Sequence, residues 1–262
     1  MGHPQTPVSA QPQWLSLAVP CYNEEDSLRN TATRLVQAFR ERNLGLELVL
    51  VDNGSRDRTG AIIDELIAEG LPVIKETVAV NQGYGYGVLR GLTRCRAPFV
   101  GFICADGQVE AVDVAKLFEI AANAKSPKLV KVRRRFRMDG LVRKFVSIGY
   151  NGFANLLFGG LGTIDINGNP KIFPRTYYER MNLNSHDWFL DAEVMIKARR
   201  LDLPVFEMNV LGQMREGGSS NVRASTVWEF LVNLAKARFG RLGPPTATAD
   251  LPVPDRAPVA RS

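Results

Sequence analysis

Three acidic segments and one glycine-rich segment contain the residues of this sequence that could do chemistry. The acidic segments are residues 20–25, 52–57 and 104–108, and the glycine run spans residues 81–87. A carboxylate that follows a strand can hydrogen-bond a ribose or a base, or hold a divalent cation. Glycines let a backbone approach a ligand closely, but the spacing here differs from the dinucleotide-binding fingerprint. Taken alone, the glycine run therefore indicates a turn and the start of a helix.

Short apolar runs alternate with helical patterns through the first half of the chain. Strands are predicted at residues 15–19, 47–51, 73–76, 99–104 and 129–132, and helices at 24–42, 58–69, 84–93 and 112–124. This alternation is typical of a parallel sheet with helices on both faces. Ligands bind at the carboxyl ends of the strands in such sheets, and the acidic segments fall at these ends.

The composition narrows the class of protein. The chain has 262 residues, of which 45% are hydrophobic and 23% charged, and this is typical of a globular protein. No run of 18 apolar residues and no secretory signal is visible, so we expect a cytoplasmic protein without a membrane span. Cys21, Cys95 and Cys104 lack metal-binding spacing and fit a reducing compartment, and two histidines exclude a multi-histidine zinc site.

Basic residues gather in one segment. Residues 125–144 contain nine basic residues and one acid, which gives a net charge of +8 there and −2 in the rest of the chain. Such a cluster fits anionic lipid, a diphosphate or nucleic acid, or simply forms a solvated basic face. We expect no nucleic-acid partner, because no aromatic residues are interleaved with the charges.

The acidic and glycine-rich segments together resemble glycosyltransferase family 2, and within it the dolichyl- or polyprenyl-phosphate sugar synthases. The likeness rests on residues 19–25, 51–59 and 81–85 with Asp106 and Gln108, and it covers roughly residues 15–238. It implies an α/β GT-A fold, with a mostly parallel sheet flanked by helices and with amphipathic helices toward the C-terminus. The expected organisation is a domain over residues 14–242, with a nucleotide-sugar half (14–132) and an acceptor- or membrane-facing half (133–242). Residues 1–13 and 243–262, rich in proline, are expected to be disordered tails.

The resemblance also implies the site residues. Those expected at the nucleotide sugar are Pro20, Tyr22, Glu24, Asp52, Gly54, Cys104, Ala105, Asp106, Arg133, Arg134, Lys171 and Arg215. Asp106 and Gln108 would hold Mg²⁺ or Mn²⁺, and Asp106, Arg215 and Asp191 would be catalytic. Simpler roles stay open, because Glu24 and Asp57 could cap helices and Asp52 and Asp106 could be turn-forming aspartates.

One position departs from the family pattern. The family usually has an acid two residues before Asp106, and this sequence has Cys104. A thiol is a poor partner for magnesium, but one carboxylate, one amide and the phosphate oxygens still form a plausible ligand set. Weaker metal binding, an altered metal preference and loss of activity are all compatible with this change.

Residues 141–158 follow a helical apolar pattern with a polar stripe at Arg143, Ser147, Asn151 and Asn155. The pattern fits a core-facing helix, and equally an interfacial helix with basic residues at the lipid headgroups. Similar synthases place a helix at the bilayer surface here, which favours the second interpretation. Residues 222–238 are a candidate for a further surface helix.

Acids near residue 190 raise the question of a general base. Asp191 is the best match to the base of relatives with hydroxyl acceptors, with Asp187 and Glu193 weaker, although acids also favour a first helical turn. His186 is expected to be a loop histidine. Arg215 resembles a phosphate-binding arginine of a closing loop, but Asn221 stands where that loop has lysine.

These features lead to three hypotheses. The first is transfer of a hexose from a nucleotide sugar to a polyprenyl phosphate, with inversion and with possible contact to a membrane surface. The second is a family 2 glycosyltransferase that acts on a hydroxyl of a small metabolite or glycan, which requires a base such as Asp191. The third is a non-catalytic nucleotide-sugar-binding protein, which Cys104 motivates.

Overall fold

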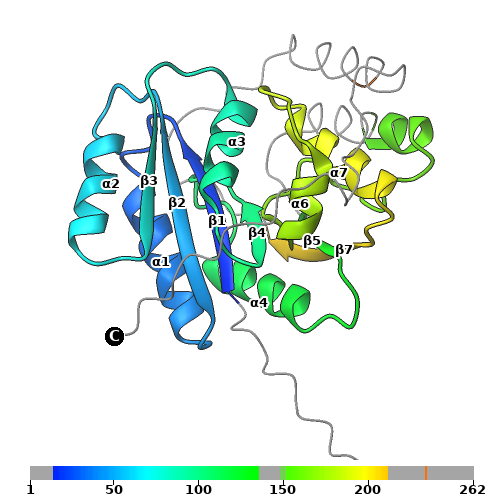
Figure 1. The fold of residues 1–262 in the computed structure, drawn as a ribbon, viewed down its shortest axis with the longest axis horizontal. Coiled ribbons are helices and arrows are strands. Elements are labelled where there is room, and N and C mark those ends of the chain that lie inside the picture. The colour runs from blue at the N-terminus through cyan, green and yellow to red at the C-terminus, as the bar shows by residue number, and fades with distance from the viewer. Residues whose placement is uncertain (1–13, 136–148, 150, 212–233, 235–262) are drawn as a thin grey trace, which may run out of the picture.

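The structure is a computed structural model, and it describes residues 14–135, 149, 151–211 and 234. Among these residues, seven strands form one sheet in the order β3-β2-β1-β4-β6-β5-β7 (Figure 1). The strands are β1 (Trp14–Cys21), β2 (Gly45–Asn53), β3 (Val73–Val78), β4 (Phe99–Phe102), β5 (Leu129–Arg135), β6 (Lys171–Pro174) and β7 (Val205–Leu211). The helices are α1 (Leu28–Arg40), α2 (Thr59–Ala68), α3 (Tyr84–Arg94), α4 (Ala111–Ala122), α6 (Arg175–Met181) and α7 (Leu190–Arg200), and residues 151–157 are also helical.

The first half has the predicted strand–helix alternation. β1 lies parallel to both β2 and β4, and β2 lies parallel to β3. The chain moves outward from β1 to β3 and then returns through α3 to β4 on the other side of β1. The strand order therefore reverses between β1 and β4, which is the place where sheets of this kind bind ligands.

Two predicted helix starts are wrong. The first helix begins at Leu28 and not at residue 24, and residues 25–27 form a turn in which the Ser27 and Leu28 N–H groups both donate to the Glu24 carbonyl. The N-cap of α2 is Arg58, so Asp57 does not occupy that position. Asp57 still accepts a hydrogen bond from the Thr59 N–H at 3.0 Å, so it orders the same turn from one residue further back.

Alternation along the strands gives the sheet two buried faces. Leu15, Leu17 and Val19 of β1 pack with apolar residues of α1, α2 and α4 on one face. Ala18, between them, packs with Val49 and with residues of α3 and α7 on the other face. Because strand side chains alternate in direction, both faces of this sheet require helical cover.

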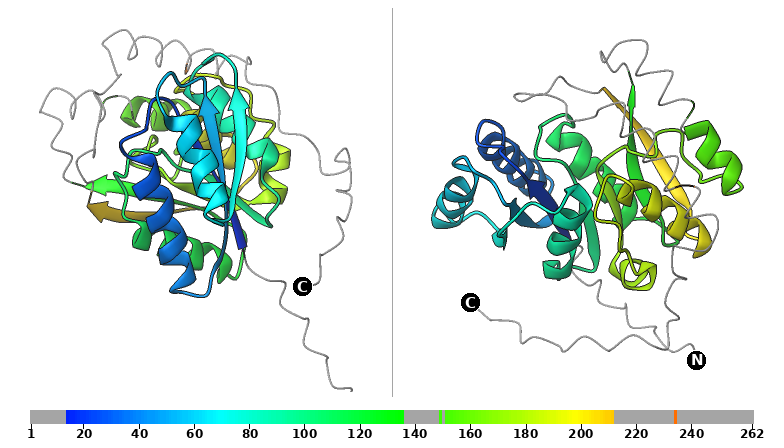
Figure 2. Two further views of the ribbon diagram at one scale, coloured as in Figure 1. Left: turned by 90° about the vertical axis from the view of Figure 1, so that its left-hand side faces the viewer. Right: turned by 90° about the horizontal axis from the view of Figure 1, so that it is seen from above.

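The second half extends the sheet with mixed strand directions, which the alternation did not predict. β6 lies antiparallel to β4 and β5, and β7 lies parallel to β5. Figure 2 shows this half beside the first three strands, with α6 and α7 on its side of the molecule. Within the described ranges, no helix has the length and apolar character needed to cross a membrane.

Candidate functional site

The loops after β1 and β2 hold each other in place at the carboxyl edge of the sheet. The Asn23 N–H donates to the Ser55 hydroxyl at 3.2 Å, and the Arg56 N–H donates to Asn23 Oδ1 at 2.9 Å. The Glu25 N–H donates to Asp57 Oδ2 at 3.1 Å. These contacts cross more than thirty residues of sequence, so the two predicted acidic segments form one interlocked surface.

The predicted nucleotide-binding residues of these loops lie on this surface. Tyr22 is 39% exposed, and Pro20 and Asp52 are half-buried. Asp52 Oδ1 accepts a hydrogen bond from the Ser55 N–H at 3.0 Å, so part of the carboxylate orders its own loop. Glu24 accepts a hydrogen bond from the Ser27 hydroxyl at 2.8 Å, but the N-cap of α1 is Ser27, so Glu24 does not cap that helix.

Gly54 makes the sharp turn that brings this surface together. Its φ angle is +75°, and a Cβ atom there would lie 2.6 Å from the backbone nitrogen of Asn81. Only glycine adopts this conformation without strain at such a close approach.

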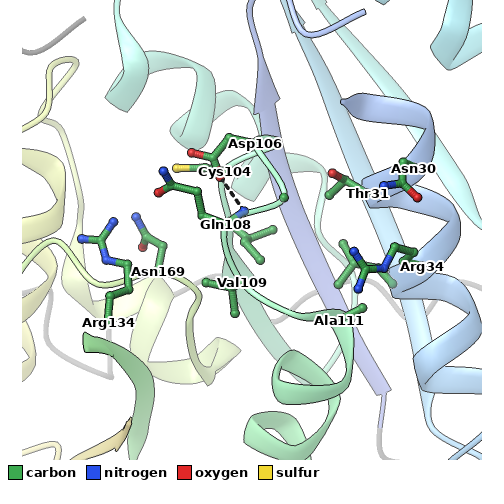
Figure 3. Close-up of a pocket in the computed structure, with 13 residues that line it drawn as sticks. Asn30, Thr31, Arg34, Cys104, Asp106, Gln108, Val109, Ala111, Arg134 and Asn169 are labelled. Carbon is green, nitrogen blue, oxygen red and sulfur yellow. Dashed lines mark hydrogen bonds between the residues drawn. The ribbon is translucent and has the colours of Figure 1, made fainter. Parts of the chain in front are cut away.

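A pocket opens beside this surface, between α1 and the loop that follows β4. It is a small pocket that is partly open to solvent. Figure 3 shows Asp106, Cys104 and Gln108 at its centre, Arg134 and Asn169 on one side, and Asn30, Thr31 and Arg34 of α1 on the other. The Thr31 hydroxyl donates to the Ala105 carbonyl at 3.1 Å and ties the loop to α1.

Asp106 and Gln108 present oxygen donors suited to a hard divalent cation. Asp106 is 7% exposed, and its Oδ1 atom accepts a hydrogen bond from the Gln108 N–H at 3.2 Å. No cluster of three or more histidine, cysteine or acidic residues that could hold a metal exists in the described part of the chain. Asp106 and Gln108 therefore fit a cation that takes further ligands from elsewhere, such as the oxygens of a diphosphate.

Cys104 is connected to the protein interior through Tyr84. The thiol and the Tyr84 hydroxyl are hydrogen-bonded, and that hydroxyl accepts a second hydrogen bond from Asn169 Nδ2 at 3.1 Å. Burial, together with the charges of Asp106 and Asp191, raises the pKa of the Cys104 thiol to about 12. The same influences raise the pKa of the Tyr84 hydroxyl well above its usual range, so both groups are protonated at neutral pH.

Arg134 faces the pocket and Arg133 does not. Successive residues of a strand point to opposite faces of its sheet, and Arg134 lines the pocket. Its guanidinium donates to both oxygens of Asp165, at 3.2 and 3.3 Å, and to the Asn167 carbonyl at 2.9 Å. Burial alone would raise the pKa of Asp165, but Arg134 and Lys131 hold it well below the usual range. Of the two predicted arginines, the structure therefore brings only Arg134 to the pocket.

Lys171 and Asp191, both predicted site residues, form a buried ion pair behind the pocket. Lys171 is 0% exposed and Asp191 is 2% exposed, and the ammonium donates to Asp191 Oδ1. Lys171 also donates to Asn169 Oδ1 at 3.3 Å. Burial lowers the pKa of Lys171, although Asp191 favours its charged form. The pair thus supports Asn169, which lines the pocket, from the interior.

The two weaker candidates for a general base have structural partners. Glu193 is fully buried, with Lys197 at 2.6 Å, and accepts hydrogen bonds from the N–H groups of Asn184 and Ser185. Asp187 Oδ1 accepts a hydrogen bond from the Phe189 N–H at 2.9 Å, just before α7. Glu193 therefore shapes the loop before α7, and it does not face the pocket.

The glycine run packs against that same loop, and His186 lies in the loop as predicted. A Cβ atom on Gly85 would lie 2.3 Å from the Ser185 carbonyl oxygen and 2.6 Å from that of Asp187. The ring of Tyr84 stacks on Trp188 with 4.3 Å between centroids. The start of α3 thus joins the two halves, and sequence reasoning missed Tyr84 and Asn169 because their partners lie far along the chain.

The helix at residues 151–157 fits the core-facing interpretation of its pattern only in part, because Ala154 and Leu157 pack on the core while other apolar residues do not. Asn151 Oδ1 accepts a hydrogen bond from the Ile166 N–H, and Asn155 Oδ1 accepts one from the Leu161 N–H, both at 2.8 Å. Phe153 and Leu156 are 41% and 81% exposed. The two asparagines therefore attach this helix to the protein together with Ala154 and Leu157, whereas Phe153 and Leu156 face outward.

Several predicted features lie outside the described residues. These are Arg215, Asn221, both tails, the segment 141–148 and most of the segment 222–238. Their predicted roles stay predictions.

Comparison of the sequence with known proteins identifies a family and several relatives. The family model described as Glycosyl transferase family 2 matches residues 16–181, more than half of the chain. A dolichyl-phosphate β-glucosyltransferase of Trichomonas vaginalis is 28% identical over 244 residues, which covers 88% of this chain and 75% of that protein. An undecaprenyl-phosphate 4-deoxy-4-formamido-L-arabinose transferase of Pseudomonas fluorescens is 30% identical over 134 residues, 51% of this chain and 39% of that protein.

Solved structures share the fold. Glucosyl-3-phosphoglycerate synthase from Mycobacterium tuberculosis, in complex with Mn²⁺, uridine diphosphate and glucosyl-3-phosphoglycerate, superposes with a TM-score of 0.65. The identity is 20%, and the match covers 90% of this chain and 82% of that chain. A likeness at this identity confirms the predicted GT-A fold.

Proposed function

This chain belongs to glycosyl transferase family 2, and we propose that it transfers a hexose from a nucleotide sugar to a polyprenyl phosphate. The observation that carries the proposal is the pocket where Asp106, Gln108 and Arg134 meet beside the switch in strand order. The acceptor class is supported by the relatives, which are named as dolichyl-phosphate and undecaprenyl-phosphate sugar transferases.

The interlocked loops after β1 and β2 are the proposed site of the nucleoside. Tyr22 is exposed and offers an aromatic face to a base, with Pro20 and Glu24 beside it. Asp52 is half-buried at the end of β2, where an acid accepts hydrogen bonds from a ribose or a base. Gly54 forms the sharp turn that brings these groups to one surface.

The pocket is the proposed site of the diphosphate. Asp106 and Gln108 would hold Mg²⁺ or Mn²⁺, and such a cation when bound stabilises the charge of the departing diphosphate. Arg134 is fixed by Asp165 before any ligand arrives, so its positive charge is preorganised for the same task. Arg215 is proposed as a further phosphate contact on the basis of the sequence.

The kind of acceptor decides whether an acidic residue must act as a general base. One oxygen of the lipid phosphate bonds to the anomeric carbon while the bond from that carbon to the nucleoside diphosphate breaks. The diphosphate leaves with the electron pair, and the configuration at the carbon inverts. Because the attacking phosphate is already an anion at neutral pH, no general base has to take a proton. Asp191 is then a positioning residue, which holds Lys171 and through it Asn169.

The helix at residues 151–157 is the proposed contact with the membrane that contains the acceptor. Phe153 and Leu156 present apolar surface, and the predicted basic cluster supplies charge for anionic headgroups. Flotation with vesicles of phosphatidylglycerol and phosphatidylcholine tests this contact. Leu156→Glu should reduce the bound fraction several-fold, whereas Gly152→Glu, a charge of equal sign on the same helix, should reduce it less. Absence of wild-type binding at low salt would overturn the membrane contact.

The transferase proposal is tested by following the sugar. Purified protein is incubated with Mn²⁺, a polyprenyl phosphate in detergent, and radiolabelled UDP-glucose or GDP-mannose. The proposal predicts that label from one donor enters the organic phase, and that Asp106→Asn abolishes this transfer. Label carried to a water-soluble acceptor would support transfer to a hydroxyl instead. An absence of transfer with every donor and acceptor would overturn the proposal.

A further inference from the structure

One carboxylate, that of Glu207 on β7, holds the stretch of chain at residues 163–165. Glu207 Oε1 accepts a hydrogen bond from the Thr163 hydroxyl and another from the Asp165 N–H at 3.3 Å. Glu207 Oε2 accepts one from the Ile164 N–H at 3.2 Å. The Glu207 side chain is only 13% exposed, so these charge-assisted hydrogen bonds form largely away from water and fix the path of the stretch.

Lys131 holds the same stretch at a different atom. Lys131 and Glu207 are register partners on the parallel strands β5 and β7, and the ammonium lies 2.9 Å from Glu207 Oε1. The ammonium also donates to the Asp165 carbonyl at 2.5 Å. Asp165 is thus held at its N–H by Glu207 and at its carbonyl by Lys131. Its side chain remains to bind Arg134, which lines the pocket.

The charges of this group depend on one another. Burial alone would raise the pKa of Glu207, but Lys131 and the Thr163 hydroxyl lower it, so the carboxylate is charged at neutral pH. Burial and the charge of Lys171 lower the pKa of Lys131 to about 8, while Asp165 and Glu207 favour its charged form. Loss of the Glu207 charge would therefore weaken both groups that hold the Asp165 backbone.

Close packing keeps the chain after Asp165 against β5. A Cβ atom on Gly168 would lie 2.1 Å from the Val132 carbonyl oxygen and 2.8 Å from the Lys131 ammonium nitrogen. The Gly168 N–H also donates to the Asp165 carbonyl at 2.9 Å. Asp165 therefore has a fixed position relative to the strand that carries Arg134.

We propose that Glu207, together with Lys131, is a positioning residue for sugar transfer. Glu207 does not line the pocket. It fixes Asp165, and Asp165 directs the Arg134 guanidinium toward the diphosphate before the nucleotide sugar binds. The inference rests on the proposed function, which assigns the diphosphate to this pocket.

The test is a double-mutant cycle between Glu207 and Arg134. Glu207→Gln removes the charge and should lower kcat about tenfold, with less than about a twofold change in KM for the acceptor, because Arg134 serves the departing diphosphate. Arg134→Met should lower kcat about 100-fold. If Glu207 acts through Arg134, adding Glu207→Gln to Arg134→Met causes no further loss.

Glu193→Gln is the matched control for this cycle. Glu193 also binds a buried lysine, Lys197, and also accepts hydrogen bonds from two consecutive backbone N–H groups, those of Asn184 and Ser185. It holds the loop before α7 and not the residues that bind Arg134. Any loss of kcat in Glu193→Gln should therefore be the same factor with and without Arg134.

Thr163→Val keeps the test decisive if Glu207→Gln does not fold. Valine preserves the shape of threonine and removes one hydrogen bond to Glu207. It should lower kcat about threefold in the wild-type background and leave kcat unchanged in Arg134→Met. Equal losses in the two backgrounds would overturn the proposal.

Binding of UDP or GDP with Mn²⁺, measured by calorimetry on the same variants, separates this inference from the proposed function. Glu207→Gln should weaken nucleotide binding about fivefold, and only while Arg134 is present, because a free arginine must be ordered by the ligand. This pattern without any sugar transfer supports the inference while the proposed function fails. Transfer with equal losses in both backgrounds, or with none in Glu207→Gln, overturns the inference alone. No nucleotide binding by the wild-type protein contradicts both.

Discussion

The two halves of the sheet use their acids in different ways. In the first half, Asp52 lies at the end of β2 and Asp106 in the loop after β4, and both accept hydrogen bonds from backbone N–H groups nearby in the chain. In the second half, Asp191 and Glu193 lie in the core and bind lysines. An aspartate at the carboxyl edge of the sheet can face a ligand, whereas an aspartate opposite a buried lysine is needed to neutralise it. Whether an acidic residue has a buried lysine as its partner therefore distinguishes a structural residue from a site residue better than its residue type does.

Buried lysines distinguish the part of the chain from β5 onward. Lys131, Lys171 and Lys197 are each 0% exposed, and each contacts a carboxylate. Removing one partner of a buried ion pair is costly, because it leaves an uncompensated charge away from water. Substitutions of acids in the second half should therefore act first on stability, and those in the first half first on ligand binding.

The largest effect is expected for Asp106→Asn. Loss of the carboxylate at the diphosphate should lower kcat/KM by about 1,000-fold, which corresponds to about 4 kcal/mol of transition-state stabilisation. The free energy of unfolding should change by less than about 1 kcal/mol. Steady-state kinetics and urea unfolding measure the two quantities, and a loss of stability with intact kinetics would contradict the comparison.

The next effect is expected for Asp191→Asn. The variant leaves Lys171 buried beside a neutral group, so the free energy of unfolding should fall by about 3 kcal/mol. The double variant Lys171→Met/Asp191→Leu removes both charges and should recover most of this loss. Chemical denaturation of the single and double variants gives the coupling energy. A stable Asp191→Asn protein that has lost only its activity would instead support the role of Asp191 as a general base.

The ion pair between Arg134 and Asp165 predicts a pH dependence. The pKa of Asp165 is lowered in the folded state, so its contribution to stability is present above its unfolded pKa and is lost as the pH falls below about 4. Asp165→Asn should cost about 2 kcal/mol at pH 7. The difference from wild type should shrink as unfolding is measured at pH 5, 4 and 3. A difference that stays constant with pH would show that the charge of Asp165 is not responsible.

The smallest effect is expected at the junction between the halves. Gly85→Ala places a methyl group against two backbone oxygens and should cost about 1.5 kcal/mol. Gly152→Ala is the matched control, because nothing lies within 4 Å of its added Cβ atom and the residue is helical. That substitution should be neutral or stabilise by up to about 1 kcal/mol. Thermal unfolding compares the stabilities of the two variants. Equal effects would mean that the loop before α7 moves to accommodate the added methyl group at little cost.

Much of the first half could be predicted because its signals are local. The acidic segments at the ends of β1, β2 and β4 follow apolar runs in the sequence. The sequence alone therefore places Asp52 and Asp106 at one edge of the sheet. The departure at Cys104 was equally visible, because a family pattern defines what is missing. Precise helix starts were not predictable, since the turn at Glu24 depends on backbone hydrogen bonds.

The second half could not be predicted in the same way. The partner of Lys171 lies twenty residues away at Asp191, and no periodic pattern connects them. The stripe of Asn151 and Asn155 shows that a helix has a polar face, but not that the loop at residues 161–166 binds this face. The antiparallel strand β6 is only four residues long, and the turn signals before it at residues 167–170 do not show which strands it pairs with.

The central claim is that the acids of the first half bind the ligand and those of the second half bind buried lysines. The most direct test is the anomalous diffraction of Mn²⁺ in crystals of the complete chain. The crystals are grown with UDP, or with GDP if that is the nucleotide bound. The account predicts a manganese peak within ligand distance of Asp106 and of the diphosphate oxygens, with the Asp191 carboxylate still on Lys171. A peak that has Asp191 or Glu193 among its ligands, or a nucleotide bound away from Asp106, would contradict it.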